Sequence, residues 1–102
     1  MAMIPEIDRT LHEPARQIIL LYLISVKHAD FTFLKQQTGL TQGNLSSHLS
    51  KLESAGFISI QKTFKQKRPL TIIELSDLGR DAFTVYIKNM FAYFGELNAL
   101  IK

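Results

Sequence analysis

The chain has 102 residues, 46% of them hydrophobic and 21% charged, with a formal net charge of +3, which suits one domain around one modest core. It contains no cysteine, so disulfides and thiolate metal sites are excluded and a reducing compartment is expected. No signal peptide opens the sequence, and its most apolar run, residues 18–24, is too short to cross a bilayer, so we expect a cytoplasmic protein without membrane contact.

The first predicted element is a strongly apolar helix from Pro14 to about Lys27. Proline suits the first turn of a helix, where its missing N–H costs nothing. One apolar side of this helix is formed by Ile19, Leu20 and Leu23. Ile18 and Tyr22 spread apolar surface beyond that side, so we expect the helix to be buried in more than one direction.

Two short helices separated by a tight turn are predicted next, over residues 32–55. Thr32 is placed to cap the first, and Gly39 is placed to end it with a left-handed residue. Thr41 can cap the second helix two residues later, and Gly56 stops it. Such a pair is a helix-turn-helix.

The second of these helices, residues 42–55, has an unusual surface. Leu45, Leu49 and Leu52 recur at helical spacing and predict its buried side. The opposite side is rich in serine, glycine and asparagine, each less favourable in a helix than alanine by roughly 0.3–1 kcal/mol. Short polar side chains let a helix approach the floor of the DNA major groove, where Gln and Asn can pair with adenine. We interpret it as a recognition helix, although taken alone a soluble helix of weak propensity explains it equally well.

From Phe57 to about residue 75 the pattern alternates with a period of two, which predicts two strands joined by the basic tip KQKRP. A helix-turn-helix followed by a basic hairpin is the order of a winged-helix domain, which is mainly α with a small β-hairpin. The tip of such a wing lies along the DNA backbone, so Lys65, Lys67 and Arg68 are predicted phosphate or minor-groove contacts. Alternatively, lysines at a hairpin tip can prevent the exposed edge of the sheet from pairing with another molecule and aggregating.

Positive charge is concentrated around these two elements. Residues 41–70 carry Lys51, Lys62 and the three basic residues of the tip against Glu53 alone, a net charge of +4, while residues 1–40 sum to zero and residues 71–102 to −1. A localised basic surface suits a polyanion, because each neutralised phosphate releases a condensed counterion. Lys62 is therefore a further predicted DNA contact, although a solvated surface without a partner would explain a patch of this size by itself.

The last predicted element is a long helix over residues 77–100, capped by Ser76 or Asp77. Its apolar residues step by four and three positions, which is the spacing of a coiled-coil seam. A chain of 102 residues is too short to cover both this seam and the apolar excess of the first helix, so we expect a homodimer. The predicted dimerisation residues are Ile18, Tyr22, Phe83, Ile87, Met90, Phe94, Leu97 and Ile101. A two-fold dimer would present two recognition helices about 34 Å apart to an inverted repeat.

Residues from about Glu13 to Tyr93 resemble winged-helix transcriptional regulators of the MarR and ArsR-like kind. The resemblance is carried by LTQGNLSSHL in the second short helix, KRP in the hairpin tip and LS followed by LGR at the entry to the last helix, and it is strongest to a compact prokaryotic subgroup. It implies that double-stranded DNA is contacted by Thr41, Gln42, Asn44, Ser46, Ser47, Ser50 and Lys51, with Lys65, Lys67 and Arg68 forming the wing. Repression is the commoner outcome among similar regulators.

Catalysis fits the sequence poorly. His12, His28 and His48 are scattered over three elements, and neither a cysteine nucleophile nor a glycine-rich phosphate loop is present. His48 borders the leucine side of its helix and is expected to be a partly buried flank residue or a phosphate contact. We therefore expect no enzyme, no metal and no cofactor, while a small-molecule effector in the dimer cleft stays open. The main alternative is a winged helix that binds another protein instead of DNA.

Overall fold

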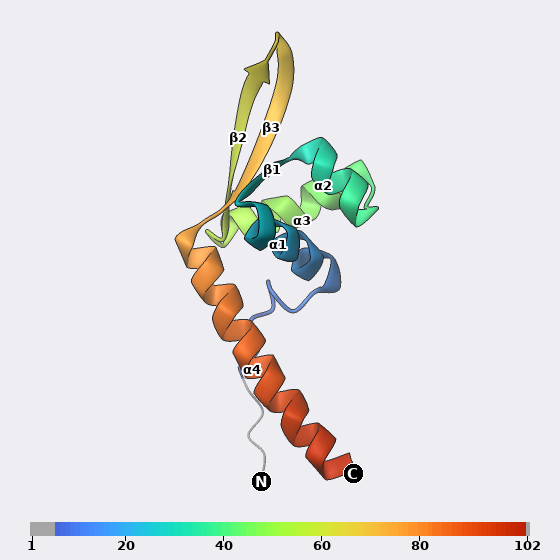
Figure 1. Cartoon of the computed structure of the whole chain (residues 1–102), viewed down its shortest axis with the longest axis vertical. Coiled ribbons are helices and arrows are strands. Elements are labelled where there is room, and N and C mark those ends of the chain that lie inside the picture. Colours follow the sequence, from blue (N-terminus) through green and yellow to red (C-terminus); the bar gives the residue numbers. More distant parts are fainter. Residues whose placement is uncertain (1–5, 102) are drawn as a thin grey trace.

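The computed structural model describes residues 6–101 as four helices and a three-stranded antiparallel sheet (Figure 1). Along the chain these are α1 (Pro14–Val26), β1 (His28–Asp30), α2 (Phe31–Thr38), α3 (Gln42–Ser54), β2 (Ile58–Lys65), β3 (Arg68–Leu75) and α4 (Asp77–Ile101). Figure 1 shows α1, α2 and α3 gathered near the foot of the β2–β3 hairpin, while the hairpin and α4 project in opposite directions. The predicted winged helix-turn-helix with a long C-terminal helix is confirmed.

The helix-turn-helix consists of α2 and α3, whose ends are set by local hydrogen bonds. The cap of α2 is Asp30, whose Oδ1 accepts from the backbone N–H of Phe33 (2.7 Å), so the predicted cap at Thr32 is wrong. A carboxylate at this position accepts the hydrogen bond, and its negative charge also interacts favourably with the positive, N-terminal end of the helix dipole. As predicted, Gly39 ends α2 in the left-handed conformation (φ 71°). Thr41 caps α3, also as predicted: its hydroxyl accepts a hydrogen bond from the backbone N–H of Asn44 (3.1 Å).

The wing is the antiparallel hairpin of β2 and β3, paired continuously from Ile58 opposite Leu75 to the residues that flank the turn. The turn itself is only Gln66 and Lys67, both with positive φ (52° and 65°). Two left-handed residues in a two-residue turn match the right-handed twist of the strands. The third strand, β1, pairs with the free edge of β3 and was not predicted, because three residues are too few to show a period.

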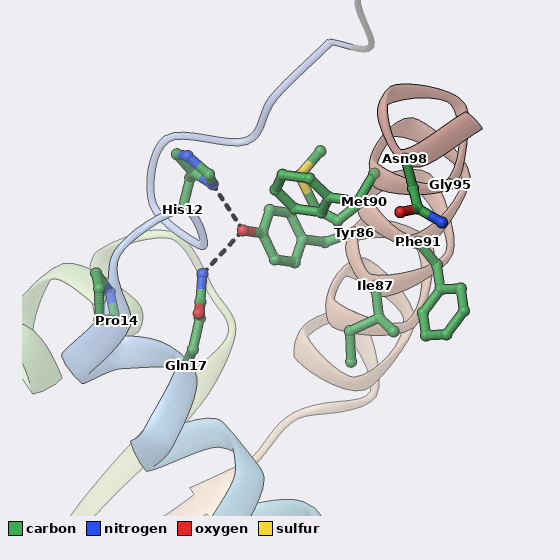
Figure 2. Close-up of a pocket in the computed structure, with 10 residues that line it drawn as sticks. His12, Pro14, Gln17, Tyr86, Ile87, Met90, Phe91, Gly95 and Asn98 are labelled. Atoms are coloured by element: carbon green, nitrogen blue, oxygen red, sulfur yellow. Dashed lines mark hydrogen bonds between the residues drawn. The ribbon is translucent and has the colours of Figure 1, made fainter. Parts of the chain in front are cut away.

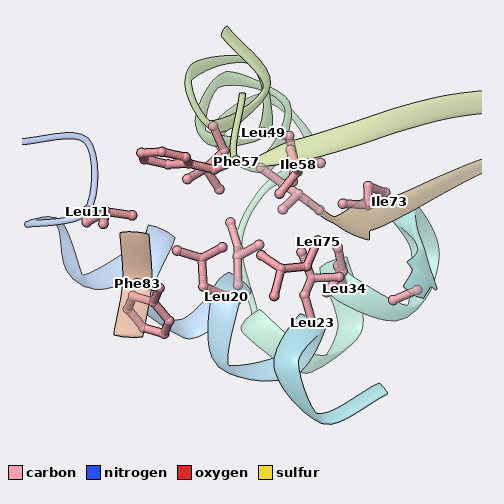
Figure 3. Packing of buried hydrophobic residues seen from close by; sticks show 14 of the residues in the cluster. Leu11, Leu20, Leu23, Leu34, Leu49, Phe57, Ile58, Ile73, Leu75 and Phe83 are labelled. Carbon is pink, nitrogen blue, oxygen red and sulfur yellow. The ribbon is translucent and has the colours of Figure 1, made fainter. Parts of the chain in front are cut away.

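The core lies between the three short helices and the base of the sheet (Figure 3). Its fully buried side chains include Leu20 and Leu23 of α1, Leu34 of α2 and Ile73 of β3. The three leucines of α3 belong to the same cluster, as predicted. Burial of a leucine is worth about 1.5–3 kcal/mol, so this side holds α3 against the domain and leaves the opposite side to solvent.

The start of α4 is fixed to the base of the wing. The Ser76 hydroxyl donates to the carbonyl of Gly56 (2.6 Å) and accepts from the N–H of Gly79 (2.9 Å), so Ser76 is the cap of this helix. Gly79 packs directly against the backbone of Phe57. The direction of α4 is therefore set by the domain and not by a flexible connection.

The first half of α4 completes the core of its own chain. Phe83, Tyr86 and Met90 are buried, and the Tyr86 hydroxyl accepts a hydrogen bond from Gln17 of α1 (2.8 Å). Phe83 and Met90 were predicted for the dimer interface, but they are only 4% and 7% exposed and belong to the core cluster of the single chain, so little of their surface is left for a partner; their role in dimerisation stays a prediction.

Candidate DNA-binding surface

The outer side of α3 is an exposed polar surface. All the residues predicted to face DNA from this element are exposed: Thr41, Gln42, Asn44, Ser46, Ser47, Ser50 and Lys51. Of these, only Thr41 uses its side chain in a hydrogen bond within residues 6–101, as the cap of the helix. The other polar groups are available to a partner, and the short serines let the amides of Gln42 and Asn44 come close to base edges.

A groove of about 730 Å³ lies between α3 and the wing. Its lining includes Gln42, Ser46 and Ser50 on the α3 side and Lys62 on the wing side. Glu53 also lines it and is able to accept from a cytosine amino group. The two elements predicted to contact DNA therefore meet across one concave surface.

The tip of the wing carries three positive charges away from the core. Lys65, Lys67 and Arg68 are all exposed, and the sequence contains no acid between Glu53 and Glu74. Figure 1 shows the hairpin extending well beyond α3, so the tip can reach a second part of an extended partner. Such a tip suits phosphate contacts, which position a protein on DNA without reading sequence.

Arg16 ties α3 to the segment before α1. Its guanidinium is buried and donates to the backbone carbonyls of Thr10 (2.6 Å) and Arg9 (3.4 Å), while Nη1 lies 3.0 Å from Nδ1 of His48 on α3. Because an arginine can only donate, Nδ1 of His48 is the acceptor in this contact. His48 is half-buried at the flank of α3, one of the two environments predicted for it.

Glu13 belongs to the same network. Its Oε2 accepts from the backbone N–H of Arg16 (2.9 Å), which caps α1, and lies 3.6 Å from Nδ1 of His48. Burial raises the pKa of the Glu13 carboxyl, but the backbone N–H groups of Arg16 and Ala15, together with the neighbouring His48 and Arg16 side chains, outweigh burial and hold this pKa below its ordinary value of 4.5. Glu13 is thus an anion at neutral pH and stabilises the start of α1.

A second groove, of about 690 Å³, lies between α4 and the start of α1 (Figure 2). The Tyr86 hydroxyl accepts from Nε2 of Gln17 and lies 2.7 Å from Nδ1 of His12. Burial raises the pKa of Tyr86 although the bond from Gln17 acts against it, so the hydroxyl stays protonated and is able to donate to His12. Most of the remaining lining is apolar and includes Ile87 and Phe94.

The predicted dimerisation residues outside the core differ in exposure. Tyr22 is half-buried and packs edge-on against Phe33 of α2, with ring centroids 6.2 Å apart, so part of its surface is used within its own chain. Leu97 is also half-buried. The exposed members are Ile18, Ile87, Phe94 and Ile101. All but Ile18 lie on α4, where Ile87 falls within the stretch that completes the core and Phe94 and Ile101 lie beyond it.

The histidines and acids of the described chain do not form a metal site. Within residues 6–101, no three His, Cys, Asp or Glu side chains gather closely enough to hold a metal ion. His12 lies against Tyr86, His48 lies against Arg16, and His28 is exposed in β1. Over that same span, the helices are too short or too polar for any of them to traverse a bilayer.

Comparison with known proteins identifies a DNA-binding family and a relative that is similar in sequence. A family model described as a winged helix DNA-binding domain matches residues 15–94. An uncharacterized protein of Methanocaldococcus jannaschii is 42% identical over 69 residues, which cover 68% of this chain and 75% of that protein.

Solved structures share the fold. A transcriptional regulator homologue from Pyrococcus horikoshii OT3 has a TM-score of 0.83 at 29% identity, covering 88% of this chain and 89% of that one. Overoxidized AbfR bound to DNA has a TM-score of 0.67 at 20% identity, covering 91% of this chain and 76% of that one, which is a likeness of fold. With most of its length matched by the family model, the chain belongs to the winged helix DNA-binding domain family.

Proposed function

We propose that this winged-helix protein is a cytoplasmic, sequence-specific transcriptional repressor that binds double-stranded DNA as a homodimer. In this proposal α3 enters the major groove and the wing follows the backbone or the minor groove. The observation that carries it is the single concave surface in which the polar side of α3 faces Lys62 of the wing. The regulator homologue from Pyrococcus horikoshii supports the regulatory role, and AbfR, solved on DNA, supports the partner.

The two elements have different proposed roles. Gln42 and Asn44 carry amides that can pair with adenine through two hydrogen bonds, so they would read sequence. Lys65, Lys67 and Arg68 carry charge at the tip and would contact phosphates whatever the sequence. Removal of the first group should change which sequence is preferred, whereas removal of the second should weaken all DNA binding.

The exposed apolar part of α4 is the proposed dimer contact. Two copies related by a two-fold axis would present two α3 helices to an inverted repeat whose half-sites lie about 34 Å apart. The 690 Å³ groove lies beside this contact and includes Phe94 in its lining. A small apolar effector bound there would therefore reach the dimer contact directly.

The test of the proposal is selection of tight binders from a randomised duplex library by the purified protein at near-physiological salt, followed by sequencing. We expect enrichment of an inverted repeat with half-sites one helical turn apart. If no sequence is enriched and binding is weak and confined to low salt, the proposal is refuted and a winged helix that binds another protein is favoured.

Variants then separate the two roles on the selected duplex, with Kd measured by fluorescence anisotropy. The triple change Lys65→Ala, Lys67→Ala, Arg68→Ala should weaken binding to selected and unselected duplexes alike, and should reduce the slope of log affinity against log salt by about 0.9 for each phosphate that the wing no longer neutralises. Gln42→Ala with Asn44→Ala should instead relax the preference at the bases they contact, by about 1–3 kcal/mol for each base. If the triple variant keeps the salt slope of the wild type, the wing does not contact DNA phosphates.

A further inference from the structure

A third groove, of about 470 Å³, lies where the segment before α1 meets the last two turns of α3. Its lining includes Arg9 and Arg16 on one side and Ser50, Lys51 and Ser54 on the other. Three of these side chains are positive and two are hydroxyls, and no acid of the described residues lines this groove. The groove therefore offers several hydrogen-bond donors together with positive charge, which suits an anion.

Arg16 makes this groove more than a loose cluster of surface charges. It is 8% exposed, and three of its five N–H groups are taken by the carbonyls of Thr10 and Arg9 and by His48. Two donors remain on a guanidinium that forms part of the groove wall. In the described chain no carboxylate oxygen lies within 4.0 Å of that guanidinium. The neighbouring Glu13 carboxylate offsets this buried charge only from beyond contact distance, so an anion in direct contact with the guanidinium would stabilise it further.

The groove lies on the polar surface already described. Ser50 lines both this groove and the groove between α3 and the wing. The polar side of α3 thus has a basic element on each flank, Lys62 of the wing on one and Arg9 on the other. A helix that lies in the major groove has a phosphate strand on each side, so both flanks are placed for backbone contacts.

If the basic residues of this groove served only to stabilise the fold, the position of Arg9 would stay unexplained. Basic residues near the C-terminal end of a helix offset its partial negative charge, and Lys51 already lies in the last turn of α3. Arg9 contributes its backbone carbonyl to Arg16, but within residues 6–101 its exposed guanidinium makes no hydrogen bond or ion pair. The position of that side chain at the groove therefore has no structural explanation in the described chain.

We infer that Arg9, Arg16 and Lys51 hold one phosphate of the DNA backbone in this groove, on the flank of α3 away from the wing. The inference rests on the proposed DNA binding and extends it, because it makes the segment before α1 part of the interface. Arg9 and Lys51 contact the phosphate from the solvent side. Arg16 contacts the phosphate from within the groove wall, and its hydrogen bond to the backbone carbonyl of Arg9 also holds Arg9 in place.

The experiment compares Arg9→Ala with wild type on the selected duplex between 50 and 200 mM salt. Removal of one phosphate contact lowers the salt slope by about 0.9, and a dimer without two of them has a slope lower by about 1.8. Because Arg16 and Lys51 stay beside the same phosphate, over this fourfold rise in salt the weakening caused by Arg9→Ala should shrink by up to about twelvefold in a dimer. Arg9→Lys keeps the charge and should keep the slope, and Lys88→Ala, which removes an exposed charge from α4, should behave as wild type.

Ethylation interference on the same complexes locates the contact. With Arg9→Ala, interference should weaken at one phosphate per half-site and keep its wild-type strength at the others. If Arg9→Ala has the slope and the interference pattern of Lys88→Ala, the inference is overturned while DNA binding itself stands. If wild type binds no duplex, the proposed function fails, and the inference fails with it. If inorganic phosphate protects wild type but not Arg9→Ala against thermal unfolding while the two bind DNA equally, the groove takes a free anion and the DNA contact is refuted.

Discussion

The placement of α4 can be tested by the single change Gly79→Ala. A Cβ added at Gly79 would overlap the carbonyl oxygen of Phe57 and lie 2.7 Å from its carbonyl carbon, so the backbone must move. That oxygen accepts from the N–H of Ser76 (3.0 Å), and breaking this bond costs about 1 kcal/mol. Overpacking around buried Phe57 costs about 1–3 kcal/mol more, while alanine returns about 1 kcal/mol of helix propensity. The expected net loss of stability is about 1–3 kcal/mol.

Thermal unfolding followed by circular dichroism measures this loss. For a domain of this size 1 kcal/mol corresponds to about 4–8 °C, so Tm should fall by roughly 5–20 °C. Gly43→Ala is the matched control, because a Cβ at Gly43 in α3 meets nothing within 4 Å. It should equal wild type or exceed it by up to about 1 kcal/mol. Equal stability of the two variants would show that α4 does not start against Phe57 and that its direction is not fixed by this contact.

Two further changes test the dimer contact and the start of α1. Phe94→Asp places a charge on the exposed apolar side of α4 and should give monomers on a sizing column, whereas Ala92→Asp on the other side of the helix should not; a dimer that survives Phe94→Asp would place the contact elsewhere. Glu13→Ala removes the cap of α1 and should lower the free energy of unfolding at pH 7 by about 1 kcal/mol. Because the folded-state pKa of Glu13 is lowered, its stabilisation is present above 4.5 and is lost as pH falls below that value, so the Tm difference from wild type should shrink in acid. A difference that persists there would mean that the carboxylate charge is not its source.

The helix-turn-helix and the wing could be predicted because their signals are local. The left-handed Gly39, the Thr41 cap and the leucines of α3 each act within one or two turns, so the printed sequence contains the whole interaction. The alternation of the wing likewise reflects pairing between strands that are adjacent in sequence. The exposure of the α3 and wing residues follows from these patterns.

The features that were missed depend on contacts between distant parts of the chain. Asp30 competes with Thr32 as the cap of α2, and which of them wins depends on where β1 ends, which in turn depends on its pairing with β3. Arg16 looks like a polar residue at the edge of an apolar helix, and only its distance to His48, 32 residues away, reveals its role. The groove around Arg9 is lined by residues from two segments that are distant in the sequence, so no spacing in the sequence could have indicated it.

α4 carries apolar side chains that differ in exposure, and the difference bears on how DNA would be read. Phe83 and Tyr86 in its first half are buried in its own chain, whereas Phe91 and Ile101 in its second half are at least 80% exposed in a molecule 59 Å long and only 25 Å and 21 Å across. Exposed apolar surface of this kind marks an interaction site. Because Ser76 and Gly79 fix α4 to the domain that holds α3, pairing of two α4 helices would also fix the distance between two α3 helices. A dimer built in this way would discriminate half-site spacing as well as base sequence, and an effector in the groove beside α4 would act by changing that distance.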